Sequence, residues 1–179
     1  EGKIQDVCLK HILPNYSVFD EVRVFSNGPL PVPVTIKGID FGILICEDAW
    51  SPETVSNLSN LGIDILIVIN GSPFDEDKIV ERQKQMSLRI NKTETSLIYV
   101  NQVGGQDELV FDGSSFVMDS YGKIIVQFPS FAFYILSDPC VFEIHGFLCL
   151  TLVNSCQNHQ HFHVALLKSE VSRMVQKPS

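Results

Sequence analysis

Basic residues are scarce in this sequence of 179 residues. It has 13 lysines and arginines against 21 aspartates and glutamates, which gives a formal net charge of −8 at pH 7. Binding to nucleic acid or to an anionic membrane surface depends on clustered basic side chains that attract phosphate groups. The sequence therefore argues against both partners and favours chemistry on a small molecule.

Paired cysteines, an uninterrupted apolar stretch and a signal-peptide pattern are also missing. The five cysteines are an odd number at irregular spacings, without a CxxC pair, so neither a disulfide framework nor a zinc ribbon is predicted. The longest apolar region, residues 131–153, is interrupted by charged residues and a proline, which makes it a poor membrane span. We therefore expect a cytoplasmic protein.

The sequence does contain an alternation of apolar runs and amphipathic helices. Residues 41–45 form a continuous apolar run, which is typical of a strand buried on both faces. A helix should follow, with Ser51 as its N-cap, Pro52 at its first position and Gly62 at its end. The next elements alternate in the same way: a strand at 63–70, a helix at 78–94 and a strand at 96–102. This pattern predicts an α/β fold.

Polar residues follow all three predicted strands. Cys46 comes after the first strand, Ser72 shortly after the second, and Asn101 at the end of the third. In α/β sheets, ligands bind in the crevice beyond the carboxyl ends of the strands. The three positions could therefore face one crevice.

Cys46 has two interpretations on the residues alone. A free cysteine at the end of a strand is most often a small buried hydrophobe. However, Glu47 and Asp48 follow at once, and two carboxylates indicate that the chain enters a polar pocket there. A nucleophilic thiolate would also need a cation, which Lys10 could supply. Glu21 and Arg23 nearby are expected to form only a local ion pair.

The pattern changes after the third strand. Residues 115–118 and 123–127 flank the turn "DSYG" and predict an antiparallel hairpin. From residue 131 onward neither a helical nor a strand period is clear. Four tail residues could bind a transition metal: Cys156, His159, His161 and His163. Two adjacent histidine pairs do not form a spaced four-ligand cage, so we expect a polar run and no metal site.

Four stretches of the sequence carry a resemblance to a known family. They are "KHILPNYSVFDEVRVF", "GILICEDAW", "INGSPFDEDK" and "YVNQVGGQDELVFDGSSFVMDSYGKII". Together they resemble consecutive blocks of the carbon-nitrogen hydrolase (nitrilase) family and, within it, the glutamine-hydrolysing domains of NAD synthetases. The resemblance covers residues 1–130. It implies an α/β fold of the nitrilase type, an α-β-β-α sandwich that is incomplete at the N-terminus.

The resemblance also implies roles for individual residues. Cys46 matches the nucleophile of the family's Glu-Lys-Cys triad, Lys10 matches the lysine, and Glu21 matches a second glutamate that supports the lysine. The positions that match the family's glutamine contacts are Tyr16, Glu47, Ser72 and Lys78. The ordinary alternatives remain open: a packing tyrosine, a helix-cap serine and a surface lysine.

The family's pattern is matched only in part. The triad glutamate should lie well upstream of Lys10, and we find no match for it; nor do we find the SGGxDS-type loop of a synthetase domain. We therefore expect residues 1–130 to be a partial glutaminase domain and residues 131–179 to be a divergent tail. The domain itself should need no cofactor, because ATP and Mg²⁺ would belong to the absent synthetase domain. Full-length members usually form homo-oligomers.

Three functions follow from the resemblance and its gaps. In the first, the domain releases ammonia from glutamine through a cysteine thioester and passes it to a synthetase domain that amidates deamido-NAD. In the second, the chain is a stand-alone amidase or carbamoylase of the nitrilase family. In the third, it is catalytically dead, because the triad glutamate is missing.

Overall fold

The computed structural model describes residues 4, 6–132, 149–153 and 163–167. The chain divides into two compact units, Glu1–Phe131 and Ala132–Ser179. All of the site residues that the family resemblance implies belong to the first unit. Its architecture therefore decides how they are arranged.

The second unit contains two short strands that the sequence did not predict. β9 (Cys149–Val153) and β10 (His163–Leu167) pair antiparallel over five positions. Strands of this length are too short for a period to stand out from the residues around them. Of the four tail residues that were considered as metal ligands, Cys156, His159 and His161 lie outside the described residues, and so does the side chain of His163.

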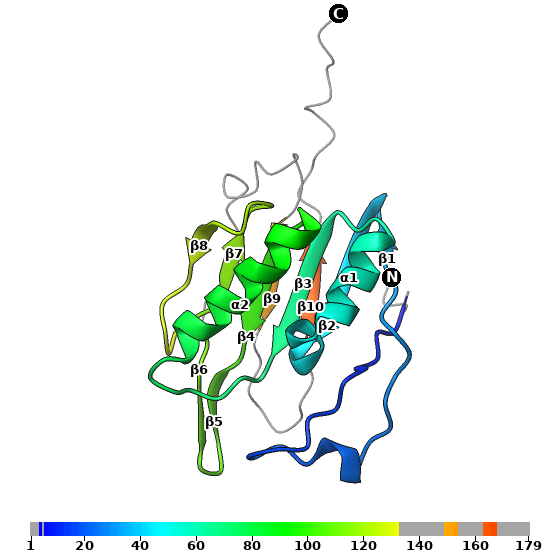
Figure 1. Cartoon of the computed structure of the whole chain (residues 1–179). Coiled ribbons are helices and arrows are strands. Elements are labelled where there is room, and N and C mark those ends of the chain that lie inside the picture. Colours follow the sequence, from blue (N-terminus) through cyan, green and yellow to red (C-terminus); the bar gives the residue numbers. More distant parts are fainter. Residues whose placement is uncertain (1–3, 5, 133–148, 154–162, 168–179) are drawn as a thin grey trace, which may run out of the picture. The chain divides into compact units, whose positions relative to one another are not determined.

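The first unit is built on a six-stranded sheet in the order β1-β2-β3-β4-β7-β8. The central strands β2 (Ile39–Ile45), β3 (Ile65–Asn70) and β4 (Ser96–Asn101) run parallel to one another. On the two sides, β1 (Val34–Ile36), β7 (Phe116–Met118) and β8 (Ile124–Gln127) pair antiparallel. The register sets Ile45 beside Ile69 and Asn70 beside Asn101, so three strand carboxyl ends share one edge (Figure 1).

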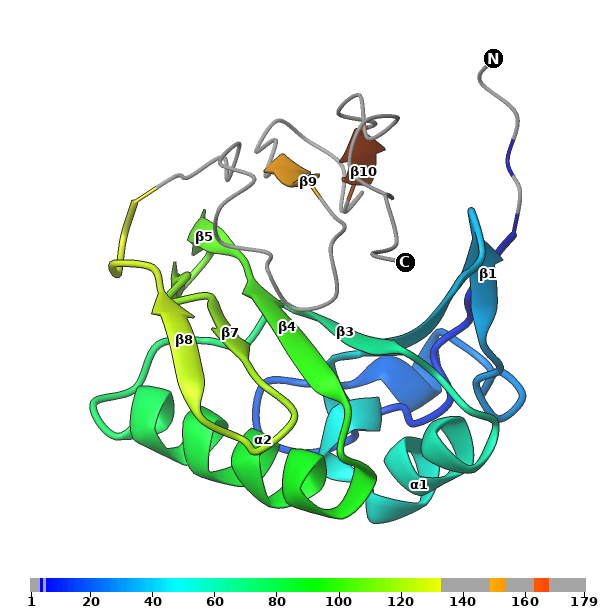
Figure 2. The same ribbon diagram turned by 90° about the horizontal axis from the view of Figure 1, so that it is seen from above.

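Two helices cover one face of this sheet. Figure 2 shows α1 (Pro52–Asn60) and α2 (Lys78–Thr93) side by side below the strands. Ser51 caps α1 by accepting a hydrogen bond from the backbone N–H of Glu53, and Pro52 occupies the first turn, as predicted. Gly62 then adopts a left-handed conformation with φ of 81°, which glycine tolerates and which stops the helix. The predicted helices are thus confirmed within two residues at each end.

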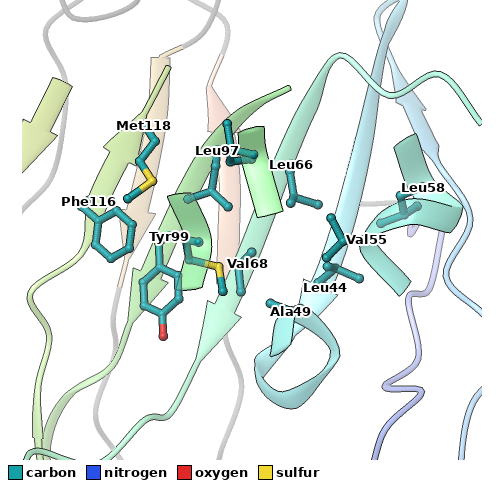
Figure 3. Packing of buried hydrophobic residues seen from close by; sticks show 12 residues of the cluster. Leu44, Ala49, Val55, Leu58, Leu66, Val68, Leu97, Tyr99, Phe116 and Met118 are labelled. Carbon is teal, nitrogen blue, oxygen red and sulfur yellow. The ribbon is translucent and has the colours of Figure 1, made fainter. Parts of the chain in front are cut away.

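The core lies between the sheet and these helices. Leu66 and Val68 of β3 alternate with Ile65, Ile67 and Ile69, so the first pair faces the helices. Figure 3 shows how neighbouring strands and α1 complete this layer. Its buried members are Leu44, Ala49, Val55, Leu58, Leu66, Val68, Met86, Ile90, Leu97, Tyr99, Phe116 and Met118. Burying one such large side chain contributes about 1.5–3 kcal/mol relative to leaving it exposed.

The predicted α/β class and the predicted 115–127 hairpin are confirmed, but several elements were not predicted. These are β1, the short 3-10 helices η1 (Glu21–Arg23) and η2 (Cys46–Trp50), and the hairpin of β5 (Val103–Gln106) and β6 (Leu109–Asp112). The glycines of "VGGQ" conceal the strand character of β5. No helix in the part of the chain that the structure describes is long and apolar enough to span a membrane.

Candidate active site

Cys46 lies where β2 ends and η2 begins. Its φ is 50°, a left-handed conformation that costs a residue with a side chain of the order of 1–3 kcal/mol. The side chain is half-buried. Such strain persists only where the surrounding structure enforces it and occurs preferentially at functional sites. The chain therefore turns sharply at Cys46, directly after the end of β2.

The thiol of Cys46 is held in its neutral form. Burial raises its pKa most, and the carboxylates of Glu47 and Glu21 raise it further. Lys10 and the backbone N–H of Glu47 act in the opposite direction. Because the pKa is raised overall, the thiol needs a base to become a nucleophile at neutral pH.

Lys10 and Glu21 form a close ion pair. The Nζ atom of Lys10 donates to both carboxylate oxygens of Glu21, at 2.6 Å each. Their side chains are 15% and 24% exposed, so the pair is partly shielded from solvent. The structure brings this pair close enough to Cys46 for both charges to act on its thiol. The local partner that the sequence suggested for Glu21 is different: Arg23 pairs with Asp20 instead.

Glu47 and Asp48 lie in different environments, although their adjacent positions in the sequence led to one interpretation for both. Glu47 is half-exposed and accepts a hydrogen bond of 2.6 Å from the hydroxyl of Tyr16. Asp48 is only 1% exposed. Its carboxylate accepts hydrogen bonds from the backbone N–H groups of His11, Ile12 and Ile45. The expectation that both carboxylates enter a polar pocket is therefore wrong for Asp48.

Ser72 is fixed by a buried network beyond β3. The Nε atom of Arg82 donates to its hydroxyl oxygen at 3.1 Å, and another nitrogen of Arg82 donates to its carbonyl at 2.9 Å. Asn101 accepts from the backbone N–H of Ser72 at 2.9 Å. Ser72 and Asn101 therefore meet at the edge of the sheet, as their positions after the strands predicted.

Arg82 forms a buried ion pair that the sequence analysis did not identify. Its guanidinium donates to both carboxylate oxygens of Asp112, at 2.9 and 3.0 Å, and the two side chains are 1% and 0% exposed. A single guanidinium nitrogen makes both contacts, and a close, hydrogen-bonded pairing of this kind is what a buried ion pair needs to offset its desolvation. The signal was present in the sequence, because Arg82 continues the stripe of Met86 and Ile90 at intervals of four residues.

Lys78 is engaged at the start of α2. Its Nζ atom donates to Glu81 at 2.8 Å and lies 5.2 Å from the ring centre of Trp50, a cation–π geometry. Trp50 belongs to η2, the helix that Cys46 opens. Lys78 therefore lies near the cysteine's own helix, while its charge is paired locally.

A tyrosine hydroxyl lies buried near these groups. Tyr99 of β4 stacks on Phe116 with ring centres 4.6 Å apart, and its hydroxyl has no hydrogen-bond partner among the described residues. Burial raises the pKa of Tyr99, Arg82 opposes this, and Cys46 and Asp112 add to it. The sequence showed Tyr99 only as part of an apolar strand. In the described ranges, no cluster of three or more His, Cys, Asp or Glu side chains could hold a metal ion.

Comparison with known proteins identifies the family. The sequence profile of the carbon-nitrogen hydrolase family matches residues 2–136. The glutamine-dependent NAD(+) synthetase of Acinetobacter baylyi is 45% identical over 131 residues, which cover 73% of this chain and 24% of the relative. That of Rhodobacter capsulatus is 40% identical with the same coverage. The chain thus spans about a quarter of the length of these relatives.

Solved structures agree with the sequence comparison. Glutamine-dependent NAD+ synthetase from Acinetobacter baumannii in complex with ADP superposes with a TM-score of 0.66 at 47% identity, covering 69% of this chain and 23% of that one. A carbon-nitrogen hydrolase from Helicobacter pylori gives 0.64 at 25% identity, covering 72% and 50%. The fold is therefore of the predicted nitrilase type. Profile and fold together show that the chain belongs to the carbon-nitrogen hydrolase family of enzymes.

Proposed function

We propose that this chain forms part of a glutamine amidohydrolase site that supplies ammonia for NAD synthesis. The observation that carries the proposal is the Lys10–Glu21 ion pair, which acts on the Cys46 thiol at the end of a parallel strand. The relatives at 40–45% identity are named as glutamine-dependent NAD(+) synthetases. Their shared name supports glutamine as the ammonia source.

The proposed chemistry begins at Cys46. Its thiolate attacks the side-chain amide carbon of glutamine, and the carbonyl oxygen becomes an oxyanion. The ammonium group of Lys10 and a backbone N–H stabilise that charge. Collapse of the adduct breaks the carbon–nitrogen bond, ammonia leaves with a proton delivered by the general acid, and a glutamyl thioester remains. Water then attacks the thioester, releasing glutamate and restoring the thiol.

The general base is a further part of the proposal. Glu21 is hydrogen-bonded to Lys10 through both oxygens, and Glu47 is hydrogen-bonded to Tyr16. Neither carboxylate is therefore free to accept the proton of the thiol without losing its partner. We assign the base to a glutamate other than these two, as the family triad implies.

The proposed glutamine pocket has charges that suit an amino acid. Glu47 can pair with the α-ammonium group, and Lys78 can pair with the α-carboxylate if it exchanges Glu81 for the substrate. Because the Ser72 oxygen already accepts from Arg82, its own hydroxyl proton is left to donate to the ligand. Tyr16 holds Glu47 in place.

Ammonia would pass to a synthetase domain, in which ATP and Mg²⁺ act; the glutaminase domain itself uses no cofactor. The whole enzyme would be a homo-oligomer in the cytoplasm. Cys8 and Cys46 are free thiols in this structure, as a reducing compartment would leave them.

A second candidate is a stand-alone amidase. An amidase from Nesterenkonia sp. AN1 superposes with a TM-score of 0.59 at 25% identity, and in one of its mutants acrylamide has added to the active site cysteine. The same thiol chemistry would serve simple amides. The two candidates differ in substrate, since only a glutaminase needs the charges of Glu47 and Lys78.

A labelling experiment tests both the nucleophile and the substrate class. The chain is treated with 6-diazo-5-oxo-norleucine, an electrophile shaped like glutamine, and with acrylamide, and the modified peptide is located by mass spectrometry. We expect the first reagent to label Cys46 and glutamine to protect it, with Cys46→Ala unlabelled and Cys8→Ala labelled as usual. Labelling by acrylamide alone would favour the amidase, and label on another cysteine would overturn both. Ammonia release from glutamine by the same chain then separates an active protein from a catalytically dead one.

A further inference from the structure

The carboxylate of Asp48 connects two segments of the site that are far apart in sequence, residues 10–12 and residues 45–46. It accepts from the backbone N–H of Ile45 at 3.3 Å, directly before Cys46. It also accepts from His11 at 3.1 and 3.3 Å and from Ile12 at 2.7 Å, the two residues that follow Lys10. One buried side chain thus fixes the backbone beside the nucleophile and the backbone beside the lysine.

Asp48 makes these bonds without a basic partner. None of the ion pairs among the described residues includes it. An ionised carboxylate is buried at 1% exposure only where hydrogen bonds replace its hydration, and backbone N–H groups supply them here.

Further hydrogen bonds hold residues 10–12 from the side opposite to Asp48. The N–H of Gly28 donates to the carbonyl of Lys10 at 2.8 Å, and Asn27 donates to the carbonyl of His11 at 2.6 Å. A Cβ at Gly28 would lie 2.7 Å from Leu9 and 2.9 Å from the carbonyl oxygen of Lys10. Residues 10–12 are therefore held between residues 27–28 on one side and Asp48 on the other.

We infer that Asp48 is a positioning residue: by bonding the backbone of both segments, it fixes the segment that carries Lys10 relative to the strand end that carries Cys46. The inference rests on the proposed function only in that it assumes Cys46 to be the reacting thiol. The charged groups that act on this sulfur are Lys10, Glu21 and Glu47. Asp48 affects the Cys46 sulfur indirectly, through the position that it gives to Lys10.

The variant Asp48→Asn tests the inference, because charge and position predict opposite results. If Asp48 acted only as a nearby negative charge, its removal would lower the thiol pKa and speed alkylation. If it positions Lys10, the asparagine keeps one acceptor oxygen and presents NH₂ in place of the other, so it can bond residues 11–12 or residue 45 but not both. The link between the two segments is then lost, Lys10 moves away, and alkylation slows. We expect about a tenfold slower reaction of Cys46 with iodoacetamide at pH 8, with the pH profile displaced upward, for the full chain followed by peptide mass spectrometry.

A double-mutant cycle sharpens the test. Lys10→Met should slow alkylation by a similar factor in the wild-type background and by less than twofold in the Asp48→Asn background, because the lysine is already displaced. Effects that multiply would overturn the inference, as would an unchanged or faster reaction of Asp48→Asn. Iodoacetamide reports the thiol without any turnover of glutamine, so failure of the proposed glutaminase activity would not affect this readout.

Two further variants guard against loss of folding. Gly28→Ala displaces residues 10–12 from the opposite side while Asp48 is intact. It should slow alkylation of Cys46, as Asp48→Asn does. Asp64→Asn is the matched control, because Asp64 also accepts a backbone N–H, that of Asp40 at 2.8 Å, but lies exposed before the start of β3. It should leave the Cys46 profile unchanged. Normal alkylation in a folded Gly28→Ala chain would contradict the inference.

Discussion

The two sides of the site are held in place by different forces. Cys46 and Ser72 follow parallel strands that rest on a core of fully buried side chains. Lys10 and Glu21 belong to residues 6–33, where the only regular element is η1 and many large apolar side chains are exposed. Those side chains are Val7, Leu9, Val18, Val22, Val24, Phe25, Leu30 and Val32.

This difference shows which contacts carry each side. On the strand side, close packing and register fix the positions, together with the buried network of Arg82 at Ser72. On the lysine side, little apolar surface is buried, and the positions depend on hydrogen bonds to Asp48 and Gly28. Variants on the strand side should therefore change mainly the free energy of unfolding, and variants on the lysine side should change mainly the reactivity of the thiol.

The largest effect on stability is expected from Arg82→Met. The substitution leaves Asp112 buried at 0% exposure without its cation, which costs about 3–5 kcal/mol of unfolding free energy. Urea unfolding followed by circular dichroism measures it. The double variant Arg82→Met with Asp112→Leu should recover part of the loss, and a loss below about 1 kcal/mol in the single variant would contradict the buried pair.

A core truncation should rank next. Met86→Ala removes a side chain that is 0% exposed and leaves a cavity under the sheet, at a cost of about 2–5 kcal/mol. Val80→Ala on the same helix is the control, because Val80 is 67% exposed, and it should change stability by no more than about 0.5 kcal/mol. Equal effects of the two variants would mean that α2 does not bury the face that carries Met86.

Lys10→Met should have a small effect on stability and a large effect on the reactivity of Cys46. Its ion pair with Glu21 is partly exposed, so the unfolding free energy should fall by no more than about 1 kcal/mol. Alkylation of Cys46 by iodoacetamide should nevertheless slow clearly, since Lys10 is a main group that lowers the pKa of this thiol. A large loss of stability with unchanged alkylation would erase the distinction between the two sides.

The raised pKa of Cys46 predicts a pH dependence of stability. The folded chain holds the thiol proton more tightly than the unfolded chain, so this contribution is fully present below the pKa of the unfolded thiol and is lost as pH rises through the raised folded value. Between pH 7 and pH 10, Cys46→Ser should therefore lose less stability than its parent. Both chains should carry Cys8→Ser, because burial and Asp6 raise the pKa of Cys8 as well. A parent that gains stability over this range relative to Cys46→Ser would contradict the sign.

The smallest effect is expected from Arg23→Ala. Arg23 and Asp20 form an ion pair with side chains that are 74% and 53% exposed, where solvent screens the attraction. Stability should change by no more than about 0.5 kcal/mol, and the alkylation rate of Cys46 should stay the same. Slower alkylation of Cys46 in this variant would show that η1 as a whole positions Glu21.

The same difference explains what could be predicted from the sequence. Strands and helices around Cys46 follow from runs such as residues 65–70 and from the caps at Ser51 and Gly62, because local propensity and burial agree there. Lys10 lies in a segment without periodicity, so the residues alone offered it only as a possible cation, and the family resemblance gave it a role. The role of Asp48 could not be identified by either route, since two of its three partners are backbone N–H groups 36 and 37 positions away in the chain.

Arg82 was missed for another reason. A charged residue in a charged helix is normally exposed, and the interval of four residues to Met86 was not enough to outweigh that expectation. Its partner Asp112 ends β6, a strand of the hairpin that the sequence analysis did not find. Buried ion pairs of this kind depend on tertiary contacts that local patterns do not contain.

The left-handed backbone of Cys46 has a consequence for how this position can change over time. With φ at 50°, glycine would occupy the position without strain, whereas a β-branched residue would be strained there. Replacing the cysteine by glycine would thus remove the thiol while relieving the backbone. Selection for a stable chain and selection for a reactive one act in opposite directions on this single codon.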